Sequence, residues 1–146
     1  MASMSAEQLI TAEEFSQRLA LWCLRGDGEL PRKSRDLHIL LTAASLWMEP
    51  GVVYAEREVT EKLGEWLDSV CPALKVDAVT LRRELVDRLY LDRDAAGTHY
   101  SAGPGPREWR FEDEVSCVDP IAVVQKARAD REERRRAWEA RQRDDA

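Results

Sequence analysis

Several basic residues in this sequence are placed where they could bind phosphate groups. Arg32, Lys33 and Arg35 stand just before and at the start of a predicted helix, where backbone N–H groups also favour anions. Lys75 precedes a later predicted helix, and Arg93 lies in a predicted β-hairpin. All five could contact the backbone of DNA. For the first group a solvated surface cluster is an equally good interpretation, because basic runs are common on protein surfaces.

The predicted helix over residues 77–89 carries two adjacent arginines that need different interpretations. At about 100° per residue, Arg82 falls on the inward, apolar face of this helix. We expect its guanidinium to be partly buried and paired with a carboxylate, because a buried charge needs a partner. The alternative is that Arg82 lines a pocket and binds an anionic ligand. Arg83 points outward, where it could contact a phosphate or pair with Asp87 at i+4.

The outward face of the same helix is only partly suited to a polyanion. Thr80 and Arg83 can donate hydrogen bonds there, but Glu84 and Asp87 share the face. The whole chain is acidic, with a formal net charge of −6. This argues against a generally basic nucleic-acid-binding protein, although local patches can still steer binding.

Residue types that support catalysis or metal binding are sparse. The three cysteines are far apart, and no C-x-x-C or Cys/His cluster is present, so neither a zinc site nor a disulfide framework is expected. His38 lies on a predicted buried helix, which is more typical of a core histidine than of a catalytic base. No phosphate-binding glycine loop, dinucleotide-binding pattern or nucleophile elbow is found. We therefore expect no catalytic residue, no metal, no cofactor and no enzymatic activity.

The elements that would position these residues follow the order helix, strand, helix, helix, strand, turn, strand. Apolar periodicity and turn residues assign them to residues 34–48, 52–54, 55–68, 77–89, 90–93, 94–97 and 98–101. This is the order of a winged helix, in which the helix before the hairpin enters the major groove of DNA. The predicted fold class is mainly α with a small β-hairpin (α+β).

Three parts of the chain are predicted on this basis. Residues 1–29 form an N-terminal helical extension, residues 30–103 the winged-helix-like domain, and residues 104–146 a linker and a charged C-terminal helix. Residues 1–10 are expected to be loose. Thr11 then caps a helix, which we expect to pack on the back of helix 34–48 because that helix is apolar on both faces.

The C-terminal helix is expected to begin at Asp119 and Pro120. Its outer part is almost wholly charged, which is typical of a solvated helix with i,i+4 ion pairs, or of a basic arm on nucleic acid. Trp138 either docks on another subunit or covers the domain. No apolar run approaches the roughly 20 residues of a membrane span. Together with cysteines typical of a reducing compartment, this predicts a cytoplasmic protein.

Several short segments together resemble a bacterial family of unknown function, numbered twenty eighty-seven, over about residues 30–101. They are Leu30-Pro31-Arg32-Lys33, Glu49-Pro50-Gly51, Tyr54, Glu58-Val59, Leu81-Arg82-Arg83-Glu84-Leu85-Val86-Asp87, Leu91-Asp92-Arg93, Gly97 and Tyr100. The sequence departs from the family pattern at Thr60, where the family tends to have Asn, and at Arg88-Leu89, where it tends to have an aromatic residue and Gly. The resemblance implies a link to transcription regulators and no enzyme activity.

Two functions compete on these observations, with a third in reserve. The leading hypothesis is a winged-helix module in transcription regulation that binds double-stranded DNA. The alternative is a protein-interaction module, in which the acidic helix face and the flanking helices bind a protein partner or a second copy of the chain. The third is a sensor of a small anionic ligand through Arg82.

Overall fold

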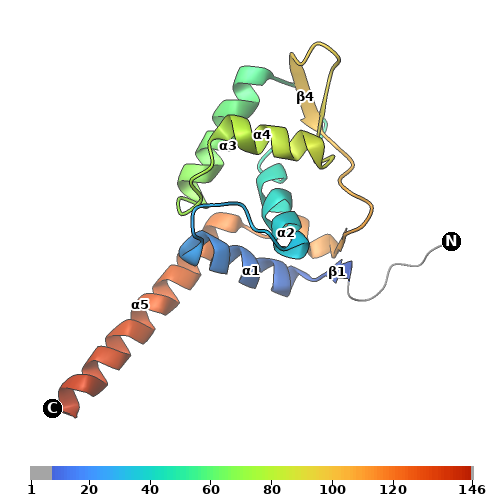
Figure 1. Cartoon of the computed structure of the whole chain (residues 1–146). Coiled ribbons are helices and arrows are strands. Elements are labelled where there is room, and N and C mark those ends of the chain that lie inside the picture. Colours follow the sequence, from blue (N-terminus) through green and yellow to red (C-terminus); the bar gives the residue numbers. More distant parts are fainter. Residues whose placement is uncertain (1–7, 146) are drawn as a thin grey trace.

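The computed structural model describes residues 8–145, and its helices and strands are shown in Figure 1. Their bounds, in chain order, are β1 Leu9–Ile10, α1 Ala12–Arg25, α2 Ser34–Ser45, β2 Tyr54–Ala55, α3 Glu56–Ser69, α4 Ala78–Asp87, β3 Leu91–Arg93, β4 His99–Ala102, β5 Arg110–Phe111, the 3₁₀ helix η2 Asp113–Cys117 and α5 Pro120–Asp144. The fold is mainly helical with small sheets, as the sequence predicted.

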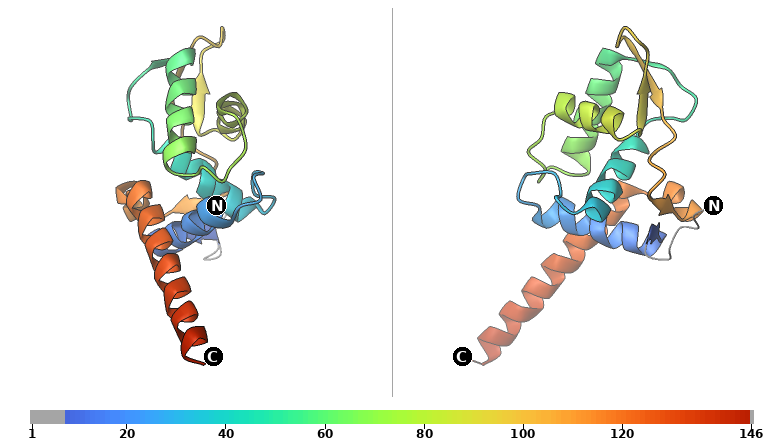
Figure 2. Two further views of the ribbon diagram at one scale, coloured as in Figure 1. Left: turned by 90° about the vertical axis from the view of Figure 1, so that its left-hand side faces the viewer. Right: turned by 45° about the vertical axis from the view of Figure 1, so that its right-hand side comes forward.

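The elements from α2 to β4 have the order and strand pairing of a winged helix (Figures 1 and 2). Strands β2, β4 and β3 form one antiparallel sheet in that order, with Tyr54 opposite Tyr100 and Leu91 opposite Ala102. Helix α4 comes directly before the β3–β4 hairpin, which we call the wing. The central strand, β4, is the last of the three in the chain, and the order helix, strand, helix, helix, strand, turn, strand is the one that the sequence predicted.

Helix starts are set by side-chain caps, of which the sequence indicated those at Thr11 and Asp119. Thr11 accepts a hydrogen bond from the Glu14 N–H at 3.1 Å and caps α1. Asp77 accepts from the Thr80 N–H at 2.7 Å and caps α4, and this bond together with the Thr80 hydroxyl lowers the pKa of Asp77. Asp119 caps α5, with Pro120 at the first helical position. Short polar side chains at these positions satisfy backbone donors that the helix leaves free.

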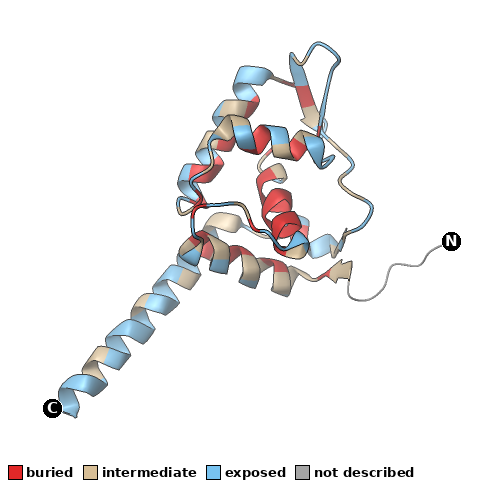
Figure 3. Cartoon of the chain, in the orientation of Figure 1, coloured by how far each residue is buried: buried red, intermediate tan, exposed pale blue. Residues whose placement is uncertain are grey.

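A single hydrophobic core joins the winged-helix elements to the flanking helices (Figure 3). Helix α2 lies at its centre and is buried on both faces, with Ile39 and Leu40 almost inaccessible. Helix α1 packs against α2, as predicted, and Arg18 on α1 donates to Asp36 on α2 at 2.8 Å. The three cysteines are free. The N-terminal extension is thus part of the same folded body as residues 30–103.

The prediction that residues 1–10 are loose is wrong for its last two residues, and residues 1–7 lie outside the described part of the chain. Leu9 and Ile10 form β1, which pairs in parallel with β5, and Ile10 is fully buried. Two-residue strands carry too little periodicity for sequence analysis to assign, and their pairing depends on a segment about 100 residues away. This small sheet ties the N-terminal segment to the segment that follows the wing.

Helix α5 is anchored only at its beginning and then projects away from the body (Figures 1 and 3). Val124 is buried, whereas nearly every residue after it is exposed or half-exposed. Arg135 bridges Glu132 and Glu139, and Arg136 pairs with Glu132. The prediction of a solvated helix with ion pairs one turn apart is confirmed. Within residues 8–145, no helix is long and apolar enough to cross a membrane.

Candidate nucleic-acid interface

A cleft of about 430 Å³ lies between α4, the first turn of α3 and the wing. Its walls carry three arginines and two carboxylates, so positive charge predominates. The lining residues are Glu56, Arg82, Arg83, Val86, Asp87, Arg93, Ala96, Gly97 and Tyr100. We call this the arginine cleft. It lies between α4 and the β3–β4 hairpin.

Arg82 forms the floor of the arginine cleft and is held rigidly. Its side chain is about 10% exposed, and Nη1 lies 3.2 Å from the Glu56 carboxylate. The same nitrogen donates to the Thr60 hydroxyl at 2.8 Å, and the guanidinium carbon lies 5.5 Å from the centre of the Tyr100 ring. The expectation of a buried, paired guanidinium is confirmed. Thr60, which replaces the Asn common in the resembling family, serves here as a hydrogen-bond acceptor.

Arg83 and Arg93 stand on the two sides of the arginine cleft with their guanidinium groups exposed. Arg83 comes from α4, whereas Arg93 ends β3 next to the turn of the wing. Among the described residues, neither forms an ion pair, so the pairing of Arg83 with Asp87 considered from the sequence is not formed. A Cβ added at Gly97 would lie 3.6 Å from the Arg93 guanidinium, so the arginine lies along the turn of the wing.

The turn of the wing is held by hydrogen bonds of its own. The Asp94 carboxylate accepts from the Thr98 N–H and the Thr98 hydroxyl, both at 2.7 Å, and lies 3.1 Å from the His99 Nδ1. These donors hold the pKa of Asp94 well below its usual range. Gly97 takes a φ of +71° in this turn, a conformation that glycine adopts without steric cost. The wing therefore has a defined shape before any partner binds.

The region that contains the arginine cleft matches a known family. The family model DUF2087, described as "Uncharacterized protein conserved in bacteria", matches residues 28–102. The chain belongs to this family. The match spans α2 to β4 and contains every residue of the arginine cleft. No curated protein and no solved structure matches the chain.

The other predicted basic residues of the DUF2087 region lie outside the arginine cleft. Arg32 is 94% exposed and 3.9 Å from Glu29, and it lines a separate hollow with Lys33. That hollow also contains Asp27, Glu29 and Asp36, so its carboxylates outnumber its cations and it suits an anion poorly. Lys75 donates to the Pro72 carbonyl at 3.0 Å. Thr80 is exposed in the first turn of α4.

Arg35 has a structural position instead of facing outward. Its guanidinium binds the Glu14 carboxylate through two hydrogen bonds of 2.5 Å, donates to the Leu9 carbonyl at 3.0 Å and lies over the Trp109 ring at 5.6 Å. These hydrogen bonds, with help from Arg18, lower the pKa of Glu14. These contacts join α1 and the segment after the wing to α2. Arg35 does not line the arginine cleft.

Sequence analysis missed two members of the arginine cleft, Glu56 and Tyr100. Glu56 lies in the first turn of α3, and only the fold brings it to Arg82, 26 residues away in the sequence. Tyr100 is the inward residue of β4 and is 3% exposed. The inward position of Arg82 on the helical wheel was a usable signal, because it required some carboxylate partner nearby.

Proposed function

We propose that this DUF2087 protein is a non-enzymatic, cytoplasmic DNA-binding protein that acts in transcription regulation. The observation that carries the proposal is the convergence of Arg82, Arg83 and Arg93 in one cleft between α4 and the wing. In this proposal α4 enters the major groove and the wing lies along the adjacent backbone, as in other winged helices. The two histidines have structural contacts, His38 with Tyr90 and His99 with Asp94, which agrees with a role that is not catalytic.

The three arginines have different roles under this proposal. Arg83 and Arg93 are exposed and without ion pairs among the described residues, so they would donate to phosphate oxygens as charge-assisted hydrogen bonds. Arg82 is held by Glu56 and Thr60. It would contribute to the positive electrostatic potential of the cleft and position Tyr100. Thr80, in the exposed first turn of α4, is the candidate for a base or backbone contact.

The acidic groups around the arginine cleft determine what kind of DNA binding is expected. Glu84 and Asp87 lie on α4 beside Arg83, and the net charge of the chain is −6. Such a protein gains little from non-specific attraction to DNA, because the free energy of that attraction depends on the number of phosphates that the protein neutralises. We therefore expect weak non-specific binding, and measurable affinity mainly for DNA that fits both α4 and the wing.

A binding assay with matched variants tests the proposal. Fluorescence anisotropy on the full chain, with a library of bacterial genomic fragments at low salt, should detect bound sequences. Arg83→Gln and Arg93→Gln should each weaken binding about fivefold, as expected for the loss of a hydrogen bond worth about 1 kcal/mol. Arg57→Gln is the control, because Arg57 is exposed and pairs with Glu61 on α3. Equal affinity of all three variants, or no binding to any fragment at low salt, would reject DNA binding.

A second candidate function, protein interaction, is favoured by one observation on α5. Trp138 is 56% exposed on the projecting part of this helix, and Arg131 and Arg134 line a groove with Leu21, which is itself 49% exposed on α1. At about 100° per residue, Ala127, Arg131, Arg134 and Trp138 share one face of α5. An exposed tryptophan between arginines is typical of an interface anchor.

The protein-interaction proposal predicts that Trp138 mediates assembly. Light scattering during size-exclusion chromatography of the full chain should show a dimer or larger species that Trp138→Ala converts to monomer. Ala137→Ser is the control, because it changes the neighbouring residue without removing the indole. If the chain is monomeric at all concentrations, a pull-down that recovers one stoichiometric partner, resistant to nuclease and lost in Trp138→Ala, would support the proposal. A monomer without such a partner would reject it.

A further inference from the structure

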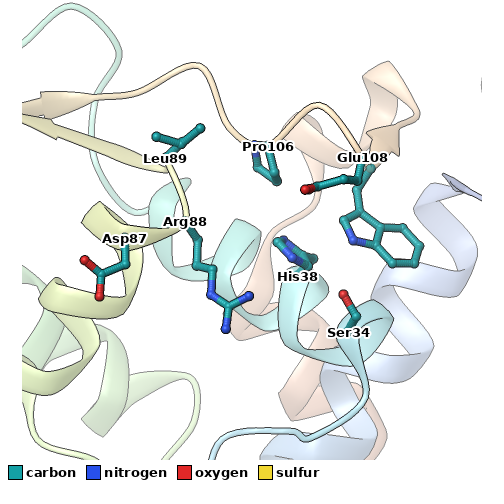
Figure 4. A pocket seen from close by; sticks show the side chains of 8 residues that line it. Ser34, His38, Asp87, Arg88, Leu89, Pro106 and Glu108 are labelled. Carbon is teal, nitrogen blue, oxygen red and sulfur yellow. The ribbon is translucent and has the colours of Figure 1, made fainter. Parts of the chain in front are cut away.

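A second cavity, of about 560 Å³, lies between the N-terminal end of α2, the C-terminal end of α4 and the segment 106–109 (Figure 4). It is distinct from the arginine cleft, which lies on the wing side of α4. The cavity combines the His38 ring, one cation (Arg88), two carboxylates (Asp87 and Glu108) and an aromatic wall. We call it the His38 cavity, and its lining residues are Ser34, His38, Asp87, Arg88, Leu89, Pro106, Glu108 and Trp109.

His38 lines the cavity with a ring of which one nitrogen, Nδ1, is hydrogen-bonded. The residue is 3% exposed, and its Nδ1 lies 2.8 Å from the Tyr90 hydroxyl. That hydroxyl donates to the His38 carbonyl at 3.3 Å and accepts from Thr42 at 3.2 Å. The tautomer with its proton on Nδ1 is compatible with this network and leaves Nε2 as an acceptor. Within residues 8–145 no group bonds Nε2, so this edge of the ring is left for a ligand.

Burial keeps the His38 ring neutral. Desolvation lowers the pKa of His38, Arg88 lowers it further, and Glu108 acts in the opposite direction. Both charges therefore lie close enough to act on the same ring. Tyr90, which holds Nδ1, has its pKa raised to about 12 by burial, so it stays a neutral partner of His38. A neutral, oriented imidazole can accept a hydrogen bond from an ammonium group.

Arg88 and Glu108 reach the cavity from opposite sides. Figure 4 shows the Arg88 side chain coming from the end of α4, and the Glu108 side chain from the segment beyond the wing, with His38 between them. No ion pair joins Arg88 to Glu108 among the described residues, and Arg88 makes only a 3.6 Å contact with Glu84. The Trp109 ring centre lies 5.9 Å from that of His38 and provides a flat wall.

Backbone strain fixes the residue that follows Arg88. Leu89 has a φ of +69°, a left-handed conformation that is unfavourable for a residue with a side chain. The chain passes tightly over it, because a Cβ at Gly103 would lie 2.5 Å from the Leu89 carbonyl oxygen and Gly105 donates to that oxygen at 2.7 Å. Strain of this kind persists where the surroundings over-determine a conformation, often at ligand sites.

We propose that the His38 cavity binds a small zwitterion of the amino-acid class. The carboxylate would pair with Arg88, the ammonium would donate to Glu108 and to the Nε2 of His38, and an apolar side chain would lie against Trp109. A ligand with one charge would engage only one of Arg88 and Glu108. This site is independent of the proposed DNA binding, because none of its charged groups that bind the ligand lines the arginine cleft.

Isothermal titration calorimetry of the full chain with three probes tests the proposal. L-Phenylalanine should bind at least about tenfold more tightly than 3-phenylpropionate, which lacks the ammonium, and 2-phenylethylamine, which lacks the carboxylate. L-Leucine and L-tryptophan extend the test to other apolar side chains. No binding by any of the three amino acids at millimolar concentration would overturn the proposal. Equal binding of 3-phenylpropionate would also overturn it, because it would indicate a simple anion site.

Variants of exposed residues separate the site from general effects on folding. Glu108→Gln and Arg88→Gln should each weaken amino-acid binding about tenfold or more, and Glu108→Gln should remove the preference for phenylalanine over 3-phenylpropionate. Glu114→Gln is the control, because Glu114 is exposed on η2 and does not line the cavity. An unchanged preference in Glu108→Gln would contradict the proposed role of Glu108. Because both variants alter exposed side chains, their thermal stability should stay near that of the parent chain.

Discussion

The arginine cleft and the His38 cavity lie on different sides of α4, and they differ in which group is buried. In the cleft the buried group is a charged guanidinium, Arg82, held by Glu56 and Thr60, and exposed cations stand around it. In the cavity the buried group is a neutral imidazole, His38, on whose pKa Arg88 and Glu108 act in opposite directions, and Asp87 adds a second carboxylate to the lining. Helix α4 thus lies between the arginine cleft, for which we propose DNA as the ligand, and the His38 cavity, for which we propose a small zwitterion.

The largest effect expected from this comparison is the loss of the buried charge in the cleft. Arg82→Ala should lower the free energy of unfolding by about 2–3 kcal/mol, below the usual cost of breaking a fully buried pair because Glu56 is half exposed. Chemical denaturation with an unchanged m-value measures this loss. The matched variant Arg83→Ala removes an exposed guanidinium and should change stability by less than about 0.5 kcal/mol. Similar effects of both variants would contradict the distinction between the two arginines.

The two regions should also respond differently to pH. Because burial lowers the folded-state pKa of His38 below its ordinary value of 6.5, the neutral ring stabilises the fold fully above about pH 6.5. That contribution is lost as the pH falls from there toward the lower folded-state pKa, at up to about 1.4 kcal/mol per pH unit. Asp94 in the wing has a lowered pKa, so its stabilisation persists above its ordinary value of 3.8 and is lost only at more acidic pH.

Denaturation curves between pH 7 and pH 5 check this assignment. His38→Gln should flatten the pH dependence in this range, while Asp94→Asn should leave it unchanged and alter only the dependence below about pH 4. If the free energy of unfolding of His38→Gln changes as steeply with pH between pH 7 and pH 5 as that of the parent chain, the neutral imidazole does not account for this pH dependence.

A smaller effect is expected from relieving the strain beside the cavity. Leu89→Gly should raise the free energy of unfolding by about 1 kcal/mol, because glycine adopts the φ of +69° without steric cost. The matched control is Leu46→Gly, since Leu46 is similarly exposed but caps α2 with a right-handed φ of −70°. That control should lower stability. A loss of stability in both variants would show that Leu89 contributes more through packing than it costs in backbone strain.

Local signals predicted the winged-helix region well. The helix starts at Thr11 and Asp119 and the apolar periodicity of α2, α3 and α4 depend on residues within one or two turns, so the order of elements followed from the sequence. The inward position of Arg82 on the helical wheel correctly predicted a buried, paired guanidinium. These properties depend on short-range geometry, which a single sequence contains.

Contacts between distant segments could not be predicted. Sequence analysis considered Arg35 as a phosphate contact or a solvated surface residue. Its partners, Glu14 and Trp109, come from α1 and from the segment beyond the wing. A single sequence does not show that these segments meet Arg35. The left-handed Leu89 was also unexpected. Glycine would be the ordinary residue for that conformation, and here the close passage of residues 103–105 enforces it on leucine. The His38 cavity forms only when three separate segments meet.

The salt dependence of DNA binding tests the central claim most directly. For the tightest fragment found, the plot of log K against log salt concentration should have a slope of about −2 to −3, as expected for two or three phosphates neutralised by the arginine cleft. The slope should become shallower by about one in Arg83→Gln and again in the double variant with Arg93→Gln. A slope near zero, or an unchanged slope in the double variant, would contradict DNA binding through this cleft.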